Sequence, residues 1–234
     1  MLTNPPLLLS IVIPVYNEEK TLEEIITRVH RSCGDFSEVI IVDDGSKDSS
    51  LEIMRKLARP QDTVLTKENG GKGSAVRMGY AQAKGKYVIV QDADLEYDPE
   101  EIPELVKFAE ENGHRAVYGS RRLKKQKQFT HILTFLGGTA LTYIFNILYF
   151  KKLSDQPTCY KMVRNDVLKT LPLKENDFRY DPEITALLAR KKIHIAESPI
   201  SYHPRSYKEG KKICWKDWFK WVWVFVKLRF ISID

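Results

Sequence analysis

The first ninety residues contain four short apolar runs, each followed by polar or glycine-rich sequence. These runs are residues 10–15, 39–42, 63–65 and 87–90. Between the first two runs, apolar residues recur at helical spacing over 21–29, and a second helical segment over 74–83 follows the third run. Continuous apolar strands that alternate with helices predict an α/β fold with a mostly parallel sheet covered on both faces.

Acidic residues follow two of these runs closely. Asp43 and Asp44 follow the second run, and Asp92 and Asp94 follow the fourth. In an extended chain residues i and i+2 point the same way, so Asp92 and Asp94 face one ligand at the edge where α/β sheets bind ligands. Neighbouring carboxylates repel each other unless a cation lies beside them, and oxygen ligands suit Mg²⁺ or Mn²⁺. The pattern predicts a metal site that also meets a nucleotide diphosphate, whereas an isolated Asp-x-Asp would favour a capped turn.

Four motifs occur in order along this half of the chain. They are Ser10-Ile-Val-Ile-Pro-Val-Tyr-Asn-Glu18, Val42-Asp-Asp-Gly-Ser46, Asn69-Gly-Gly-Lys-Gly73 and Asp92-Ala-Asp-Leu-Glu96. This ordered set resembles family 2 glycosyltransferases, and the nearest branch is the dolichyl- or polyprenyl-phosphate mannose synthase-like enzymes. The resemblance extends over about residues 8–212 and implies a single GT-A type, Rossmann-like domain that binds a nucleotide sugar.

The resemblance implies that residues at the strand ends bind the donor. The donor-binding set is Pro14, Tyr16, Glu18, Asp43, Asp44, Lys72, Asp92, Ala93, Asp94, Arg205 and Lys211. Asp94 and Glu96 would hold the metal, although many mannose synthases have glutamine where Glu96 stands. A P-loop is excluded because Gly73 follows Lys72 where a P-loop has serine or threonine. Lys72 is therefore either a solvated turn lysine or, as the resemblance implies, a neighbour of the nucleotide.

Basic residues in the second half of the chain would bind the acceptor. The segment Tyr118-Gly-Ser-Arg-Arg122 resembles the family element that meets the acceptor phosphate. The acceptor-binding set is Ser120, Arg121, Arg122 and Glu183, and the catalytic set is Asp92, Asp94, Arg121 and Arg205. The planar fork of arginine suits phosphate oxygens, whereas a solvated arginine pair is the alternative. Asp181 and Glu183 lie near the position where hydroxyl-using relatives carry a catalytic base.

Charge is distributed unevenly along the chain. Residues 1–120 contain 14 Lys and Arg against 21 Asp and Glu, a net charge of −7, whereas residues 121–234 contain 23 against 10, a net charge of +13. The basic residues lie beside long apolar stretches, which favours an anionic membrane surface and a phosphate-bearing substrate over nucleic acid. The three cysteines are odd in number and widely spaced, which indicates reduced packing residues of a cytosolic protein.

Residues 129–150 form a 22-residue stretch without Asp, Glu, Lys or Arg, long enough to span a bilayer. On a helix, its few polar and glycine positions fall on one narrow stripe and leave a broad apolar face. This pattern favours an amphipathic helix that lies in the membrane interface. A membrane span is the first alternative, and a buried helix pair broken near Gly137 and Gly138 is the second.

Residues 213–234 contain all four tryptophans of the chain, with lysines between them. Indoles favour the headgroup zone and lysines extend to water, so the segment is typical of a membrane-interface helix. Core packing or a dimer contact is the alternative. The predicted organisation is a glycosyltransferase domain over 1–212, with a nucleotide-sugar half over 1–120 and an acceptor half over 121–212, followed by an interface segment over 213–234.

These features predict an inverting glycosyltransferase that transfers a hexose, with mannose favoured, from a nucleotide sugar to a polyprenyl or dolichyl phosphate. GDP-mannose is the first donor and a UDP-hexose the second, with Mg²⁺ or Mn²⁺ as cofactor. The enzyme is expected to be peripheral or monotopic at the cytoplasmic face of an anionic membrane, with oligomeric state open. A lipid phosphate, whose second pKa is about 6, needs no general base. The alternatives are a carbohydrate hydroxyl acceptor, with Asp181 or Glu183 as base, and a catalytically silent membrane-binding module.

Overall fold

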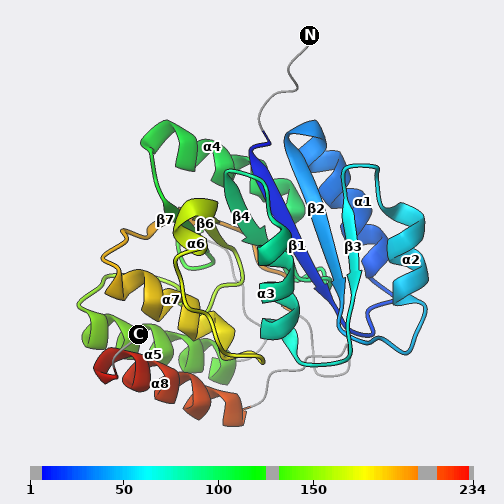
Figure 1. Ribbon diagram of the computed structural model, residues 1–234. Helices are drawn as coiled ribbons and strands as arrows, with labels where there is room; N and C mark the ends of the chain where they lie inside the picture. The colour runs from blue at the N-terminus through cyan, green and yellow to red at the C-terminus, as the bar shows by residue number, and fades with distance from the viewer. Residues whose placement is uncertain (1–6, 125–131, 205–214, 232–234) are drawn as a thin grey trace.

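The structure, a computed structural model, describes residues 7–124, 132–204 and 215–231 of the 234-residue chain (Figure 1). The elements in chain order are β1 Leu9–Val15, α1 Leu22–Cys33, η1 Gly34–Phe36, β2 Ser37–Asp43, α2 Ser50–Leu57, β3 Thr63–Thr66, α3 Lys72–Gln82, β4 Tyr87–Val90, η2 Pro99–Glu101, α4 Ile102–Asn112, β5 Ala116–Ser120, α5 Ile132–Tyr149, β6 Lys161–Arg164, α6 Asn165–Leu168, α7 Tyr180–Arg190, β7 Ala196–Pro199 and α8 Trp215–Phe230. The four strands predicted in the first ninety residues are therefore all present.

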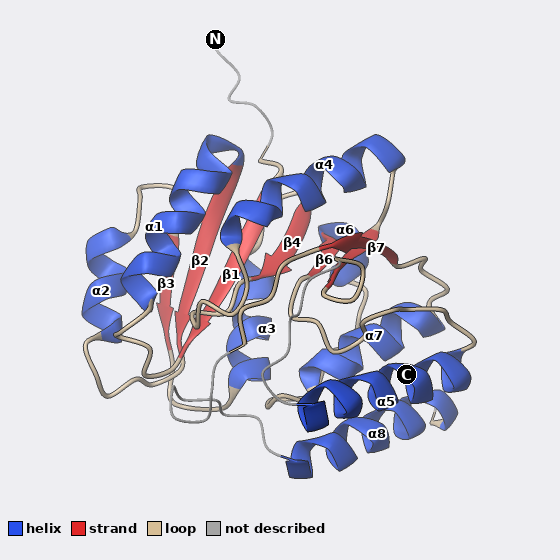
Figure 2. Cartoon of the chain, turned by 180° about the vertical axis from the view of Figure 1, so that it is seen from behind, coloured by secondary structure: helices blue, strands red, loops and turns tan. Residues whose placement is uncertain are grey.

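Seven strands of the described residues form one sheet in the order β3-β2-β1-β4-β6-β5-β7. Neighbouring strands run parallel except at β6, which is antiparallel to both β4 and β5. Figures 1 and 2 view the sheet from opposite sides and show α3 on one face and α1 and α4 on the other. The predicted mostly parallel α/β fold is confirmed, and β6 and β7 from the second half of the chain complete the sheet.

Burial explains why the central strands read as continuous apolar runs. All four residues of β4 and all seven of β2 are buried, as expected for strands covered on both faces. Helix α3 lies especially close to β1, because a Cβ atom at Gly79 would be only 2.4 Å from Val12 Cγ1. The register pairs Val15 with Asp43, which brings the ends of β1 and β2 to the same edge of the sheet.

Helix α5 is continuous through Gly137 and Gly138, so the alternative of a broken helix pair is wrong. The described part of its polar stripe is turned inward. Thr142 is buried and donates to the carbonyl of Gly138, and the Asn146 amide exchanges hydrogen bonds with the backbone of Leu153. Leu141, Phe145 and Tyr149 are buried as well, whereas Leu136, Tyr143 and Ile147 are exposed, so the helix presents apolar residues both to the core and to the outside.

Helix α8 contacts both α5 and α7, and all three lie together in Figures 1 and 2. Trp221, Val224 and Phe225 are buried, so core packing accounts for one side of this helix. At the carboxyl end of α8, the Arg190 guanidinium donates to the carbonyls of Leu228 and Ile231, at 2.6 and 2.5 Å. Among the described residues, no helix has both the length and the apolar character needed to cross a membrane.

Candidate active site

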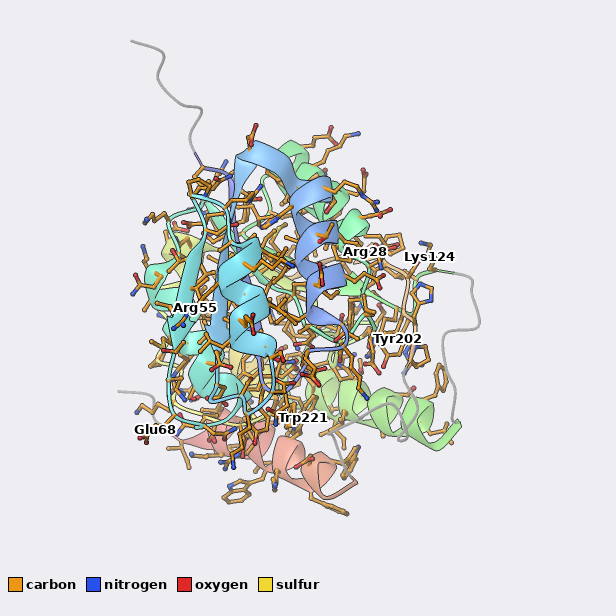
Figure 3. The ribbon with its side chains drawn as sticks, turned by 90° about the vertical axis from the view of Figure 1, so that its right-hand side faces the viewer. Arg28, Arg55, Glu68, Lys124, Tyr202 and Trp221 are labelled. Atoms are coloured by element: carbon orange, nitrogen blue, oxygen red, sulfur yellow. The ribbon has the colours of Figure 1, made fainter. Side chains whose placement is uncertain are left out.

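A cavity of about 890 Å³ opens at the carboxyl edge of the sheet and extends to α5 and α8. The predicted site residues that line it are Pro14, Tyr16, Glu18, Asp44, Lys72, Asp92, Ala93, Asp94, Glu96 and Arg121. Residues that the sequence did not predict as site residues also line it, namely Tyr97, Gly137, Gly138, Leu141, Phe178, Tyr180, Trp218, Phe219 and Trp221. Arg205 and Lys211 lie outside the described residues. Figure 3 labels two lining residues, Tyr202 from the segment after β7 and Trp221 from α8.

Asp44 shapes the glycine-rich turn that precedes α3. Its Oδ1 accepts from Lys67 Nζ at 2.6 Å and from the Gly70 N–H at 2.9 Å, and its Oδ2 accepts from the Gly71 N–H at 2.8 Å. Gly71 has φ +94°, a conformation that favours glycine. Asp44 therefore positions the turn as well as lining the cavity. Asp43 does not line the cavity, and its Oδ1 accepts from the Ser46 N–H at 3.1 Å.

Lys72 is the first residue of α3, and its ammonium group lies 2.5 Å from Asp92 Oδ1. Burial is the largest influence on the pKa of Lys72 and would lower it, but the charge and hydrogen bond of Asp92, together with other neighbours that include Asp94, outweigh burial and raise the pKa. The ammonium also lies 5.9 Å from the ring centres of Phe178 and Tyr180. Lys72 is thus a charged lysine inside the cavity, so the alternative of a solvated turn lysine is wrong. A lysine at a helix N-terminus suits a diphosphate.

Asp94 and Glu96 lie on a tight turn after β4. The Glu96 N–H donates to Asp94 Oδ1 at 3.1 Å, and Leu95 between them has φ +60°, which is uncommon for a non-glycine residue. Two carboxylates on one cavity wall are oxygen ligands of the kind that Mg²⁺ and Mn²⁺ prefer. The described residues contain no group of three or more His, Cys, Asp or Glu arranged to hold a metal. A metal held by this pair would complete its coordination with substrate phosphate and water.

Among the predicted acceptor residues, Arg121 lines the cavity and Ser120, Arg122 and Glu183 do not. Arg121 binds Asp155 with both arms of its fork, through Nε and Nη2 at 2.7 Å each. Asp155 is buried and Arg121 is mostly buried, and their mutual attraction raises the pKa of Arg121 and lowers that of Asp155 despite the cost of desolvation. Arg121 therefore remains charged at the boundary between the acidic and apolar parts of the cavity.

Ser120 and Arg122 support this loop from behind. The Ser120 hydroxyl is 2.7 Å from the Ser154 hydroxyl and accepts from the Arg122 N–H at 3.2 Å. The Arg122 guanidinium lies 3.7 Å from the centre of the Phe135 ring and donates to the Phe135 carbonyl. These contacts join the loop to α5, so the solvated arginine pair considered from the sequence is wrong.

The two candidate bases on α7 differ in position. Glu183 accepts from the N–H groups of Lys174 and Glu175 at 2.8 and 3.0 Å, so it holds the loop before α7. Asp181 lines the cavity and pairs with the buried Lys161. Burial raises the pKa of Asp181 and lowers that of Lys161, because desolvation disfavours both charges. Asp181 is therefore the one of these two carboxylates that a ligand in the cavity can reach.

Known proteins resemble this chain in sequence and in fold. The family described as Glycosyl transferase family 2 matches residues 10–171. Undecaprenyl-phosphate 4-deoxy-4-formamido-L-arabinose transferases from Edwardsiella ictaluri and Proteus mirabilis are 34% and 31% identical over 209 residues, 86% of this chain. The chain spans 62% of the length of each of these curated relatives.

A solved structure of glucosyl-3-phosphoglycerate synthase from Mycobacterium tuberculosis with UDP superposes with a TM-score of 0.74 at 18% identity, covering 97% of this chain and 82% of that one. A complex of the same enzyme with Mn²⁺, UDP and glucosyl-3-phosphoglycerate gives a TM-score of 0.72 at 19% identity, with 95% and 79% coverage. At these identities the likeness establishes the GT-A type fold alone. Because the family match covers more than half of the sequence, this chain belongs to glycosyl transferase family 2.

Proposed function

We propose that this protein transfers a sugar from a nucleoside diphosphate donor to a polyprenyl phosphate at the cytoplasmic face of a membrane, with Mg²⁺ or Mn²⁺ as cofactor. The observation that carries the proposal is one continuous cavity with three kinds of wall. Acids and Lys72 line its donor end, Arg121 lies between, and apolar residues of α5 and α8 line the remainder. The undecaprenyl-phosphate sugar transferases among the relatives support the same acceptor class.

The donor end offers complementary charge to a sugar diphosphate. Lys72 and the amino end of α3 suit the phosphates, and Asp94 with Glu96 would hold the metal. A bound metal would neutralise charge on the departing diphosphate. The UDP complexes of the solved neighbour favour a UDP-sugar as the first donor to test, ahead of GDP-mannose. The transferred sugar, including the hexose expected from the sequence, remains a prediction.

The acceptor end combines a cation with apolar walls. Arg121 would bind the phosphate, while Leu141, Trp218 and Trp221 would contact the first isoprene units. A phosphate monoester with a second pKa of about 6 is already ionised at neutral pH, so it attacks without a general base. Attack in line with the departing diphosphate inverts the anomeric carbon.

A broad apolar surface adjoins this end of the cavity. We call it the outer apolar face, and it consists of Leu136, Tyr143, Ile147, Phe150, Phe219, Trp223, Phe230 and Ile231. Phe150 is 83% exposed and Phe230 75% exposed. Lys151, Lys152, Lys220, Lys227 and Arg229 lie beside it in the sequence. Aromatic side chains with neighbouring cations are typical of a surface that enters an anionic membrane interface without spanning it.

The test is sugar transfer on anionic vesicles that contain undecaprenyl phosphate, with a panel of UDP- and GDP-sugars and Mn²⁺. The wild-type chain is expected to float with the vesicles and to transfer sugar to the lipid. Replacing Ile147 and Phe150 together by Asp should weaken flotation at least about tenfold, because each loses about 1.5–3 kcal/mol of apolar burial.

The matched control is Lys107→Asp on the exposed side of α4, which changes the net charge by the same two units. It should affect flotation much less. A wild-type chain that neither floats nor modifies the lipid would refute the proposed acceptor and location.

Gly137 offers a direct test of the apolar part of the cavity. Among the described residues, the one neighbour within 4 Å of a Cβ atom there would be Trp218, at 3.8 Å, so Gly137→Leu should fold while its larger side chain fills the cavity. We expect the KM for undecaprenyl phosphate to rise about tenfold, equivalent to a loss of about 1.4 kcal/mol, with UDP–Mn²⁺ binding unchanged.

Ala140→Leu adds the same side chain at an exposed position of α5 and should leave both quantities unchanged. Equal acceptor KM values for the two leucine variants would argue against lipid binding between α5 and α8.

A carbohydrate hydroxyl acceptor is the second candidate function. Its support is Asp181, a buried carboxylate on the cavity wall whose pKa is raised by burial. A hydroxyl nucleophile needs a general base, and a carboxylate of raised pKa is suited to that role. Asp181 therefore separates the two candidates in the mutational comparison described in the Discussion.

A further inference from the structure

Tyr202 contacts both ends of the cavity with one side chain. Its hydroxyl donates to Glu96 Oε2 at 2.9 Å, on the side where the metal is proposed to bind. The Arg121 guanidinium lies over the Tyr202 ring, with Cζ 4.9 Å from the ring centre, on the side proposed for the acceptor phosphate. The ring also packs against Tyr97, with centres 5.3 Å apart. Figure 3 labels Tyr202, which belongs to the segment that follows β7.

The backbone around Tyr202 is held by hydrogen bonds on both sides. The Ser201 N–H donates to both carboxylate oxygens of Glu101, at 3.0 and 2.8 Å. The His203 N–H donates to the Glu96 carbonyl at 2.8 Å. These bonds fix the backbone on both sides of position 202, so a movement of the Tyr202 ring affects its contacts with Glu96 and with Arg121 together. Burial and the nearby charge of Glu96 raise the pKa of Tyr202, so its hydroxyl is a donor at neutral pH.

The two contacts of Tyr202 have separate chemical origins. The hydroxyl orients the Glu96 carboxylate, whereas the aromatic ring supports the guanidinium of Arg121 through a cation–π contact. Arg121 is held on its other side by Asp155. A phenylalanine at position 202 would keep the ring and lose the hydroxyl, so the two contributions are separable by mutation.

We propose that Tyr202 is a positioning residue shared by the donor and acceptor sites, and that it couples metal–nucleotide binding to binding of the acceptor phosphate. This inference rests on the proposed function, since it needs a metal at Glu96 and a phosphate at Arg121. A metal that orders Glu96 also orders Tyr202, and Tyr202 in turn restricts Arg121. Binding of the first ligand then includes the loss of conformational entropy of Glu96, Tyr202 and Arg121 together. The second ligand no longer has to order these side chains, so it binds more tightly.

The test measures binding to the full chain rather than turnover. Calorimetry gives the Kd of Mn²⁺ with UDP present, and the Kd of farnesyl phosphate with and without UDP–Mn²⁺. In the wild type, UDP–Mn²⁺ should tighten farnesyl phosphate binding about fivefold or more, and farnesyl phosphate should tighten UDP–Mn²⁺ by the same factor.

Tyr202→Phe should weaken Mn²⁺ binding about tenfold, the usual loss when a group orienting a metal ligand is removed. It should also abolish the coupling, yet leave farnesyl phosphate binding without UDP–Mn²⁺ unchanged. Tyr202→Leu should weaken both Mn²⁺ binding and the binding of farnesyl phosphate in the absence of UDP–Mn²⁺, because it also removes the ring beneath Arg121. The control is Tyr87→Phe, which removes a hydroxyl bonded to the His114 carbonyl and should alter none of these constants.

Wild-type Mn²⁺ affinity and intact coupling in Tyr202→Phe would overturn the inference. A melting temperature near that of the wild type shows that each variant is folded. If the wild type binds UDP–Mn²⁺ but not farnesyl phosphate, the proposed acceptor and the coupling both fail. The Mn²⁺ affinities of the Phe and Leu variants then still decide whether Tyr202 positions Glu96.

Discussion

Replacing Asp94 by Asn is expected to lower sugar transfer at least a hundredfold while leaving the protein folded. Asp94 lines the donor end of the cavity beside Glu96, and loss of its charge would weaken binding of the proposed divalent cation, which would stabilise the departing diphosphate. Losses of about 10²–10³-fold are usual when one such electrostatic group is removed. An asparagine carbonyl can still accept the Glu96 N–H, so the turn should persist. The measurements are kcat/KM across an Mn²⁺ titration and the melting temperature.

Asp98→Asn is the matched control for this experiment. Asp98 caps η2 by accepting from the Glu100 N–H at 2.9 Å and pairs with Arg28 at 2.7 Å, and it does not line the cavity. The control should retain most of the activity. Near wild-type turnover in Asp94→Asn, or an equal loss in Asp98→Asn, would remove the metal assignment.

Removing Arg121 is expected to reduce transfer about a hundredfold or more, mainly through the acceptor. A simple Arg121→Ala variant is compromised by the fold, because it leaves the buried Asp155 carboxylate without its partner, at a cost of about 3–5 kcal/mol. The sharper variant is Arg121→Gln with Asp155→Asn, which removes both charges together. It should melt closer to the wild type than Arg121→Ala does, yet bind polyprenyl phosphate poorly and UDP–Mn²⁺ normally.

The comparison variant removes the other candidate group, Asp181, together with its buried partner. Asp181→Asn with Lys161→Met leaves no unpaired charge in that pocket wall. With a lipid phosphate as nucleophile, a measurable rate should remain and the rate should not depend on ionisation of Asp181. If Asp181 is a base, activity should fall by about 10²–10⁴-fold, and the wild-type rate should decline as pH drops below the raised pKa of Asp181. That result, with a mild effect of the Arg121 variant, would favour the hydroxyl acceptor.

The local sequence predicted the strands of the central sheet because a strand that is buried on both faces consists mainly of consecutive apolar residues. The runs that became the centres of β1, β2 and β4 are mainly apolar, and such runs occur when helices cover both faces of a sheet. The placement of acids after these runs then followed from topology, since parallel strands end at one edge. Eight of the predicted donor residues line the cavity for that reason.

Helix-forming segments were predicted less completely than strands. The stretch over 129–150 contains one helix, but its sequence did not reveal which side would face the protein. Thr142 is buried at a hydrogen-bonded position, while Ile147 and Phe150 are exposed. An amphipathic pattern identifies two different faces and cannot assign one of them to water until the neighbouring elements are known.

The partners of the charged residues were decided by tertiary structure alone. Asp155 holds Arg121 across 34 residues, and Glu96 accepts from Tyr202 across 106. Glu183, two positions from Asp181, turned out to hold a loop, because a helix places such neighbours on different sides. The sequence by itself determined the strands, the family and the acids at the sheet edge, since these depend on local patterns. The tertiary structure decided which charged residues pair, because these contacts join residues far apart in the sequence, and no local pattern indicates which distant residues will meet.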